Sequence, residues 1–121
     1  MTYPIFIFKG IFLISKHVAP IMKKQLAGTI INIGSKISRN TNVEPNKTLY
    51  ALTKYAVEGF SFSLNRELKP FGIRVVCLMP GTVNTFFSRK YKEFMSTFDV
   101  AEIVNTIIKM EQIDFESVVF K

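Results

Sequence analysis

Cysteine and histidine are almost absent from this sequence of 121 residues. With Cys77 as its one cysteine, the chain can form no internal disulfide and no cysteine-rich zinc site. A Ser-His-Asp triad would have to use His17, the one histidine, which stands in a lysine-rich stretch with helical periodicity. We expect His17 to be a solvated surface residue, so the sequence disfavours both metal chemistry and triad hydrolysis.

Long uncharged apolar runs are also lacking. Lys9, Lys16 and the Lys23–Lys24 pair interrupt the apolar amino-terminal region. No uncharged stretch of about 18 residues therefore remains for a transmembrane helix. Residues 1–14 lack the basic start and the small-residue cleavage site of a signal peptide. We expect a cytoplasmic protein without a membrane span.

Acidic residues are scarce relative to basic ones. The formal net charge is +7, and residues 1–30 contain four lysines and no Asp or Glu. The basic residues are scattered, which is typical of solvated helix faces rather than of a nucleic-acid-binding patch. We therefore expect no nucleic-acid partner, and the next interpretation of the excess charge is an anionic, phosphate-bearing ligand.

The sequence does contain a regular alternation of helix and strand patterns. Helices are expected over 10–25, over 48–68 and after an Asp99–Glu102 capping box, and strands over 29–33, 73–79 and 117–120. The strands are near-continuous apolar runs between helices, a pattern typical of parallel strands covered on both faces. The sequence therefore predicts an α/β fold with a doubly wound parallel sheet in a single domain.

Tyr50 and Lys54 stand four residues apart at the start of the second expected helix, so their side chains share one face. A lysine ammonium beside a phenol stabilises the phenolate, and a tyrosine in this environment can give or take a proton at a carbonyl or alcohol oxygen. Ser35 follows the first expected strand, and Thr85 follows the second. Because ligands of open parallel sheets bind beyond the carboxyl ends of the strands, we expect these side chains to gather there.

Several motifs occur together in a fixed order. They are the run from Gly28 to Ser35, the Tyr50–Lys54 motif, the run from Pro80 to Thr85, the helix pattern from Gly10 to Met22, and Asp99–Glu102. In this order they resemble the short-chain dehydrogenase/reductase family of the classical type, and the resemblance covers nearly the whole chain. It implies an NAD(P)-dependent oxidoreductase that transfers a hydride between a nicotinamide and a small-molecule alcohol or ketone.

The resemblance also implies a role for each matching residue. Tyr50 matches the catalytic proton donor or acceptor, Lys54 the catalytic lysine that favours ionisation of that tyrosine, and Ser35 the catalytic serine that binds the substrate oxygen. Ser38 is the alternative serine, and Asn32 is expected to make a strand-end hydrogen bond that shapes the following loop. The residues implied to bind the cofactor, NAD or NADP, are Tyr50, Lys54, Pro80, Gly81, Val83 and Thr85.

The chain departs from the family pattern at three places. Ser35 and Tyr50 are 15 residues apart, slightly more than usual, so the loop carries a small insertion. Ile7 stands where the family often has an asparagine, so the fourth catalytic partner is not matched. The six glycines form no Gly-rich turn after a strand, which leaves the pyrophosphate-binding half unmatched. We expect residues 1–121 to be one partial domain, the carboxyl-terminal half of a Rossmann-like sheet whose first strands are missing.

Two functional hypotheses follow. The first is an oxidoreductase represented by its catalytic half, and the second is a truncated, inactive family member that is non-enzymatic or acts as a pairing module. The resemblance implies a homo-oligomer through helices 10–25 and 48–68. The aromatic segment 86–98 matches the substrate loop of the family or simply packs as a short connection. Because pyrophosphate anchoring is missing, we expect the chain alone to bind NAD(H) and NADP(H) negligibly and to turn over no alcohol or ketone.

Overall fold

The computed structural model describes residues 3–39, 45–81, 83–84, 95–111, 113–114 and 116–120. In chain order its elements are α1 (Tyr3–Gln25), β1 (Gly28–Ile33), the 3₁₀ helix η1 (Lys36–Arg39), α2 (Thr48–Leu68), the 3₁₀ helix η2 (Lys69–Phe71), β2 (Ile73–Pro80), β3 (Val83–Asn84), β4 (Met95–Ser96), α3 (Thr97–Lys109) and β5 (Ser117–Phe120). The helix α2 and the strands β1, β2 and β5 match the ranges predicted from the sequence to within one residue.

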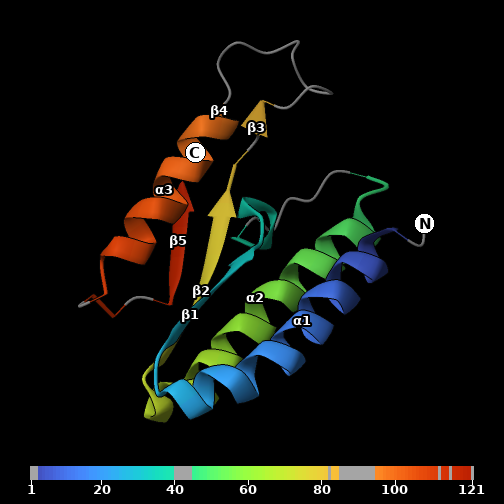
Figure 1. Cartoon of the computed structure of the whole chain (residues 1–121). Helices are drawn as coiled ribbons and strands as arrows, with labels where there is room; N and C mark the ends of the chain where they lie inside the picture. The colour runs from blue at the N-terminus through green and yellow to red at the C-terminus, as the bar shows by residue number, and fades with distance from the viewer. Residues whose placement is uncertain are drawn as a thin grey trace.

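The main sheet has the strand order β1-β2-β5, and both pairs of neighbours run parallel (Figure 1). β1 pairs with β2 from Gly28 opposite Ile73 to Ile33 opposite Leu78. The chain passes from β1 to β2 through α2, which lies on one face of the sheet. The predicted α/β class with parallel strands is therefore confirmed.

Helices cover both faces of this sheet. Successive side chains of a strand point to opposite faces. α1 and α2 lie on one face and α3 on the other (Figure 1). On the first face Val75 and Cys77 of β2 contact residues of α1 and α2, and on the second Val76 contacts α3. The side chains from Val75 to Met79 are fully buried. β2 is thus the centre of the core, and the groups at its carboxyl end rest on a closely packed base.

The helix α1 begins about two turns before the expected start at Gly10. The added turns are supported by tertiary packing, because Phe8 lies against the buried cluster between α2 and β2. The Phe8 ring also makes an edge-to-face contact with Phe60 of α2. The helix continues through Pro20, where the sequence predicts a bend or a weakened turn.

The start of α3 corrects a second prediction. α3 begins at Thr97, so Asp99 lies in its first turn and is not the N-cap that the capping box requires. A carboxylate in the first turn still stabilises the helix dipole. Before α3, the strands β3 and β4 form a parallel pair, with Val83 opposite Met95. Strands of two residues carry no periodicity, so the sequence gives no sign of them.

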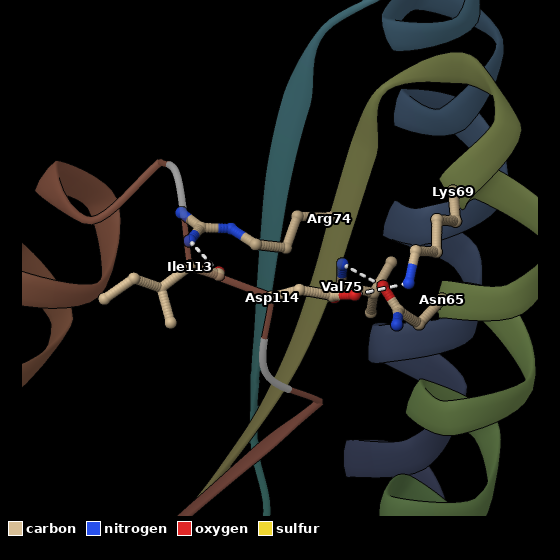
Figure 2. A network of polar contacts seen from close by, with 6 residues as sticks. All are labelled: Asn65, Lys69, Arg74, Val75, Ile113 and Asp114. Carbon is tan, nitrogen blue, oxygen red and sulfur yellow. Dashed lines mark hydrogen bonds and ion pairs between the residues drawn. The ribbon is translucent and has the colours of Figure 1, made fainter.

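A polar network closes the amino-terminal end of the sheet (Figure 2). The Arg74 guanidinium on β2 donates to the carbonyl oxygens of Ile107 at 2.7 Å and Ile113 at 3.4 Å, which caps the end of α3. Lys69 forms an exposed ion pair with Asp114. Its hydrogen bond to Asp114 raises the pKa of Lys69 above the ordinary value. The network joins the end of α2, the start of β2 and the chain that leads from α3 to β5.

Candidate functional site

The carboxyl ends of β1 and β2 lie at the same end of the molecule as the first turn of α2 (Figure 1). β1 ends at Ile33 and leads into Gly34 and Ser35. The Gly34 N–H donates to the Leu78 carbonyl oxygen at 2.7 Å, so the pairing with β2 continues for one residue beyond β1. The structure thus places Ser35 at the carboxyl edge of the sheet, beside the end of β2.

Gly34 lies closely against two buried side chains of β2. A Cβ atom added at this position would be 3.0 Å from the Cys77 Sγ atom and 3.2 Å from the Met79 Cγ atom. Both distances are shorter than an ordinary van der Waals contact, so both side chains would have to give way. The absence of a side chain at Gly34 therefore lets the turn before Ser35 rest directly on β2.

The two candidate serines differ in their surroundings. Ser35 is half-buried, and its Oγ atom accepts a hydrogen bond from the Ile37 N–H at 3.3 Å. Ser38 is 8% exposed, and its hydroxyl points inward, toward the carbonyl oxygen of Ser35 and the sulfur of Met79. Of the two, Ser35 is the serine with access to the surface.

Tyr50 and Lys54 lie one turn apart on α2. The Lys54 Nζ atom is 5.8 Å from the centroid of the Tyr50 ring and donates to the carbonyl oxygen of Ile33 at 3.3 Å. Tyr50 keeps 40% of its surface exposed. Lys54 therefore bridges the helix that carries Tyr50 and the strand end that leads to Ser35.

The environment of Lys54 changes its titration. Partial burial lowers the pKa of Lys54 from the ordinary value of 10.5, because the ammonium loses hydration on entering the structure. The buried thiol of Cys77 has a smaller, opposite effect on the pKa of this lysine. The hydrogen bond to Ile33 replaces part of the lost hydration. Lys54 is thus a cation whose proton is held less tightly than that of a surface lysine.

Buried polar contacts fix the position of α2 on the sheet. Asn32 of β1 donates through Nδ2 to the Ser61 hydroxyl at 2.9 Å, and that hydroxyl donates to the Val57 carbonyl oxygen at 2.7 Å. Val57 in turn packs against Cys77 and Met79. The sequence predicts a strand-end hydrogen bond from Asn32 that shapes the following loop, whereas the structure gives its side-chain amide a partner on α2. Asn32 and Ser61 are 29 positions apart, so no local pattern indicates this contact.

The residues expected to bind a cofactor are described in part. Pro80 is the buried last residue of β2, and Gly81 follows it. Val83 lies in β3, whereas Thr85 lies outside the described residues. Most of the expected substrate segment, residues 86–94, is outside them as well.

Among the residues that the structure describes, no group of three or more His, Cys, Asp or Glu side chains could hold a metal ion. No helix in the same part of the chain is both long and apolar enough to cross a membrane. His17 is exposed on α1, as the sequence predicts, and its Nδ1 atom lies 2.7 Å from the Leu13 carbonyl oxygen of the same helix.

The groups at the carboxyl edge suit proton transfer to an oxygen atom. The ammonium of Lys54 bonds the end of β1, which leads to the Ser35 hydroxyl, and lies 5.8 Å from the centroid of the Tyr50 phenol ring. A ligand oxygen at this edge can accept hydrogen bonds from hydroxyl groups while a nearby cation stabilises developing negative charge.

The chain is similar in sequence to curated dehydrogenases and reductases. The model of the short chain dehydrogenases matches residues 6–96. D-xylose 1-dehydrogenase from Caulobacter vibrioides is 45% identical over 77 residues, which are 64% of this chain and 30% of that protein. The 3-ketodihydrosphingosine reductase of Bacteroides thetaiotaomicron is 41% identical over 81 residues, which are 67% of this chain and 29% of that protein.

Solved structures share the fold. Serine dehydrogenase from Escherichia coli is 26% identical, with a TM-score of 0.79 over 93% of this chain and 48% of that chain. The betaketoacyl-[ACP] reductase FabG from Bacteroides thetaiotaomicron is 34% identical, with a TM-score of 0.72 over 88% of this chain and 45% of that chain. A serine dehydrogenase complexed with NADP+ is 24% identical and shares the fold with a TM-score of 0.81. The chain thus spans about half the length of these solved structures. Since the family model matches residues 6–96, this chain belongs to the short-chain dehydrogenase family.

Proposed function

We propose that this chain is the catalytic half of an NAD(P)-dependent oxidoreductase that interconverts an alcohol and a ketone by hydride transfer. The observation that carries the proposal is the position of Lys54, whose ammonium lies beside the Tyr50 ring and bonds the end of β1 next to Ser35. The names of the relatives, which are dehydrogenases and reductases, support the same reaction class.

Each residue of the site then has a task. In the direction of reduction, the carbonyl carbon of the substrate accepts a hydride, and its oxygen accepts the proton of the Tyr50 hydroxyl to form the alcohol. The Ser35 hydroxyl donates a hydrogen bond to the same oxygen. The ammonium of Lys54 stabilises the phenolate that remains on Tyr50, and the oxidation of an alcohol runs through the same groups in reverse.

The residues present fit the nicotinamide end of a cofactor. The half-buried Lys54 ammonium suits a ribose hydroxyl, and by the family resemblance Pro80, Gly81, Val83 and Thr85 would hold the carboxamide. The bound nicotinamide would supply or accept the hydride. No Gly-rich turn for the pyrophosphate occurs in the 121 residues, so the adenosine end needs groups from outside them. NAD and NADP both remain candidates.

The open edge of the sheet indicates where the groups for the adenosine end would be added. β1 is an edge strand of the sheet in the described part of the chain, and the solved relatives are about twice as long. We propose that residues 1–121 form one partial domain and that a further part of the sheet completes it beside β1. An open strand edge is a template for such pairing.

The alternative function is a non-enzymatic family member that acts as a pairing module. Ile14 and Ile21 on α1 and Leu52 on α2 are large, exposed apolar side chains, and they favour a homo-oligomer through these two helices. Analytical ultracentrifugation of the chain distinguishes a dimer from a monomer. A dimer that persists in the Tyr50→Phe and Lys54→Met variants would support pairing without deciding the question of catalysis.

The test of the proposed activity has two arms. The chain alone should bind NAD(H) and NADP(H) negligibly by calorimetry and turn over no ketone. A fusion that places the amino-terminal half of the betaketoacyl-[ACP] reductase FabG from Bacteroides thetaiotaomicron before Met1 should oxidise NADH or NADPH with a panel of ketones. In this fusion Tyr50→Phe should lower kcat at least a hundredfold, whereas Tyr55→Phe on the same helix should not. A folded, cofactor-binding fusion whose turnover does not depend on Tyr50 would refute the assignment.

A further inference from the structure

The turn that carries Ser35 is held by hydrogen bonds on both sides of that residue, to β2 before it and within the turn after it. Before it, the Gly34 N–H donates to the Leu78 carbonyl oxygen at 2.7 Å. After it, the carbonyl oxygen of Ser35 accepts the Ser38 N–H at 3.1 Å and the Ser38 hydroxyl at 3.0 Å. Two donors on one carbonyl restrict the rotation of the peptide group after Ser35, which sets the direction of its side chain.

Ser38 has a second contact, which reaches β2. Its Oγ atom lies 3.3 Å from the sulfur of Met79, a residue with no exposed surface. A hydroxyl has one proton and a thioether is a weak acceptor, so the proton belongs mainly to the Ser35 carbonyl while the sulfur offers a second acceptor. Either way, the hydroxyl is held between the turn and the strand.

Met79 supports the turn from the other side as well. Its Cγ atom would be 3.2 Å from a Cβ atom at Gly34, so the same methionine underlies both Gly34 and Ser38. Met79 is fixed in turn, because it belongs to the buried cluster with Val57 and Cys77. The turn therefore lies on a base that the core holds in place.

We infer that Ser38 and Met79 are positioning residues for Ser35, holding its hydroxyl where a substrate oxygen can reach it. This inference rests on the proposed function only for the statement that Ser35 contacts substrate. Ser38 itself does not contact substrate, because it is buried and its one proton is engaged inside the turn. Met79 acts as the floor of the turn, where its sulfur and methylene groups each contact a different residue.

The first experiment measures the turn without any activity. The Ile37 N–H donates to the Ser35 Oγ atom, so its hydrogen exchange in the 121-residue chain, followed by NMR, reports whether that hydroxyl is in place. Ser35→Ala removes the acceptor and defines the full loss of protection. Ser38→Ala should accelerate exchange at Ile37 about tenfold, and Met79→Leu, which conserves volume but removes the sulfur, should accelerate it about threefold.

The matched control is Ser61→Ala, which removes a buried serine hydroxyl that bonds Asn32 and the Val57 carbonyl elsewhere on α2. Its exchange at Ile37 should stay within twofold of the wild type after correction for the slowest amides of β2. Ser38→Thr keeps the hydroxyl and should restore most of the protection. Wild-type exchange at Ile37 in Ser38→Ala would overturn the inference, and wild-type exchange in Met79→Leu alone would remove Met79 from it.

The second experiment uses the fusion that completes the sheet. Ser38→Ala should lower kcat about tenfold with KM changed less than threefold, because the hydrogen bond to the substrate oxygen matters most as charge develops on that oxygen. Altered exchange at Ile37 in a fusion without activity would leave the positioning role standing and refute the proposed function. Activity that depends on Tyr50 but is unchanged in Ser38→Ala would support the proposed function and refute the positioning role of Ser38.

Discussion

Asn65 takes the place of a strand at the edge of β2. The Cys77 N–H donates to the Glu116 carbonyl oxygen at 3.0 Å, on the side where β5 pairs. The Val75 N–H, two residues earlier, points to the same side, before β5 has begun. There it donates to the Asn65 Oδ1 atom at 2.9 Å (Figure 2). Both residues are buried, Asn65 with 3% and Val75 with 0% of their surface exposed.

Replacing this amide with a group of similar size isolates the hydrogen bond. Asn65→Leu leaves the buried Val75 N–H without its acceptor, which costs about 1–3 kcal/mol of the free energy of unfolding. The better helix propensity of leucine offsets roughly 0.5 kcal/mol of this loss. The net loss is about 0.5–2.5 kcal/mol, and for a domain of this size each kcal/mol corresponds to about 4 °C, so the melting temperature should fall by about 2–10 °C.

Thermal and urea unfolding followed by circular dichroism measure this change. The control is Arg66→Leu at the next, exposed position of α2, which should stay within about 0.5 kcal/mol of the wild type. Hydrogen exchange at Val75 adds a local signal, because loss of the acceptor should accelerate this amide beyond the global effect. If Asn65→Leu is as stable as Arg66→Leu, the amide does not substitute for a strand and the reasoning fails.

Three further predictions concern single side chains. Arg74→Lys should lose about 1–2 kcal/mol in urea unfolding, because one ammonium cannot replace a guanidinium that donates to two carbonyl oxygens at 2.7 Å; full stability would contradict the capping role. Gly72→Ala should cost at least about 2 kcal/mol, since φ is 72° and the new Cβ would be 2.6 Å from the Leu26 carbonyl oxygen, whereas Gly59→Ala on α2 meets nothing and should not destabilise. Lys54→Met should raise the melting temperature at pH 7, because burial lowers the pKa of Lys54 and the charged lysine therefore destabilises the folded state below pH 10.5. This increase in melting temperature should become smaller as the pH approaches 10.5, and an increase independent of pH would exclude burial of the charge as its cause.

The helix in the middle of the chain could be predicted from the sequence. The apolar spacing of α2 and the stop at Pro70 and Gly72 gave the helix its observed bounds. The start of α1 could not be predicted, because Phe8 joins the helix through contacts with α2 and β2 rather than through a local pattern. The position of Asp99 as an N-cap was predicted wrongly, because a carboxylate stabilises a helix either at the N-cap or in the first turn.

The candidate site could also be predicted only in part from the sequence. Ser35, Tyr50 and Lys54 lie where strand and helix periodicity predict them, at the carboxyl end of β1 and the first turns of α2. The contact between Ser38 and Met79 joins residues 41 positions apart. It depends on the register between β1 and β2, which apolar runs leave undefined, so only the folded chain reveals it.

The attachment of α2 to β1 has a consequence for how such proteins diversify. Because Asn32 and Ser61 fasten the middle of the helix to the strand, the place of Tyr50 relative to Ser35 is set by docking and not by the length of chain between them. Residues can then be gained or lost between η1 and α2 without moving either hydroxyl. If Ser35 and Tyr50 act as proposed, selection can change the length of this connection, and with it the choice of substrate, while the two hydroxyl groups keep their relative position.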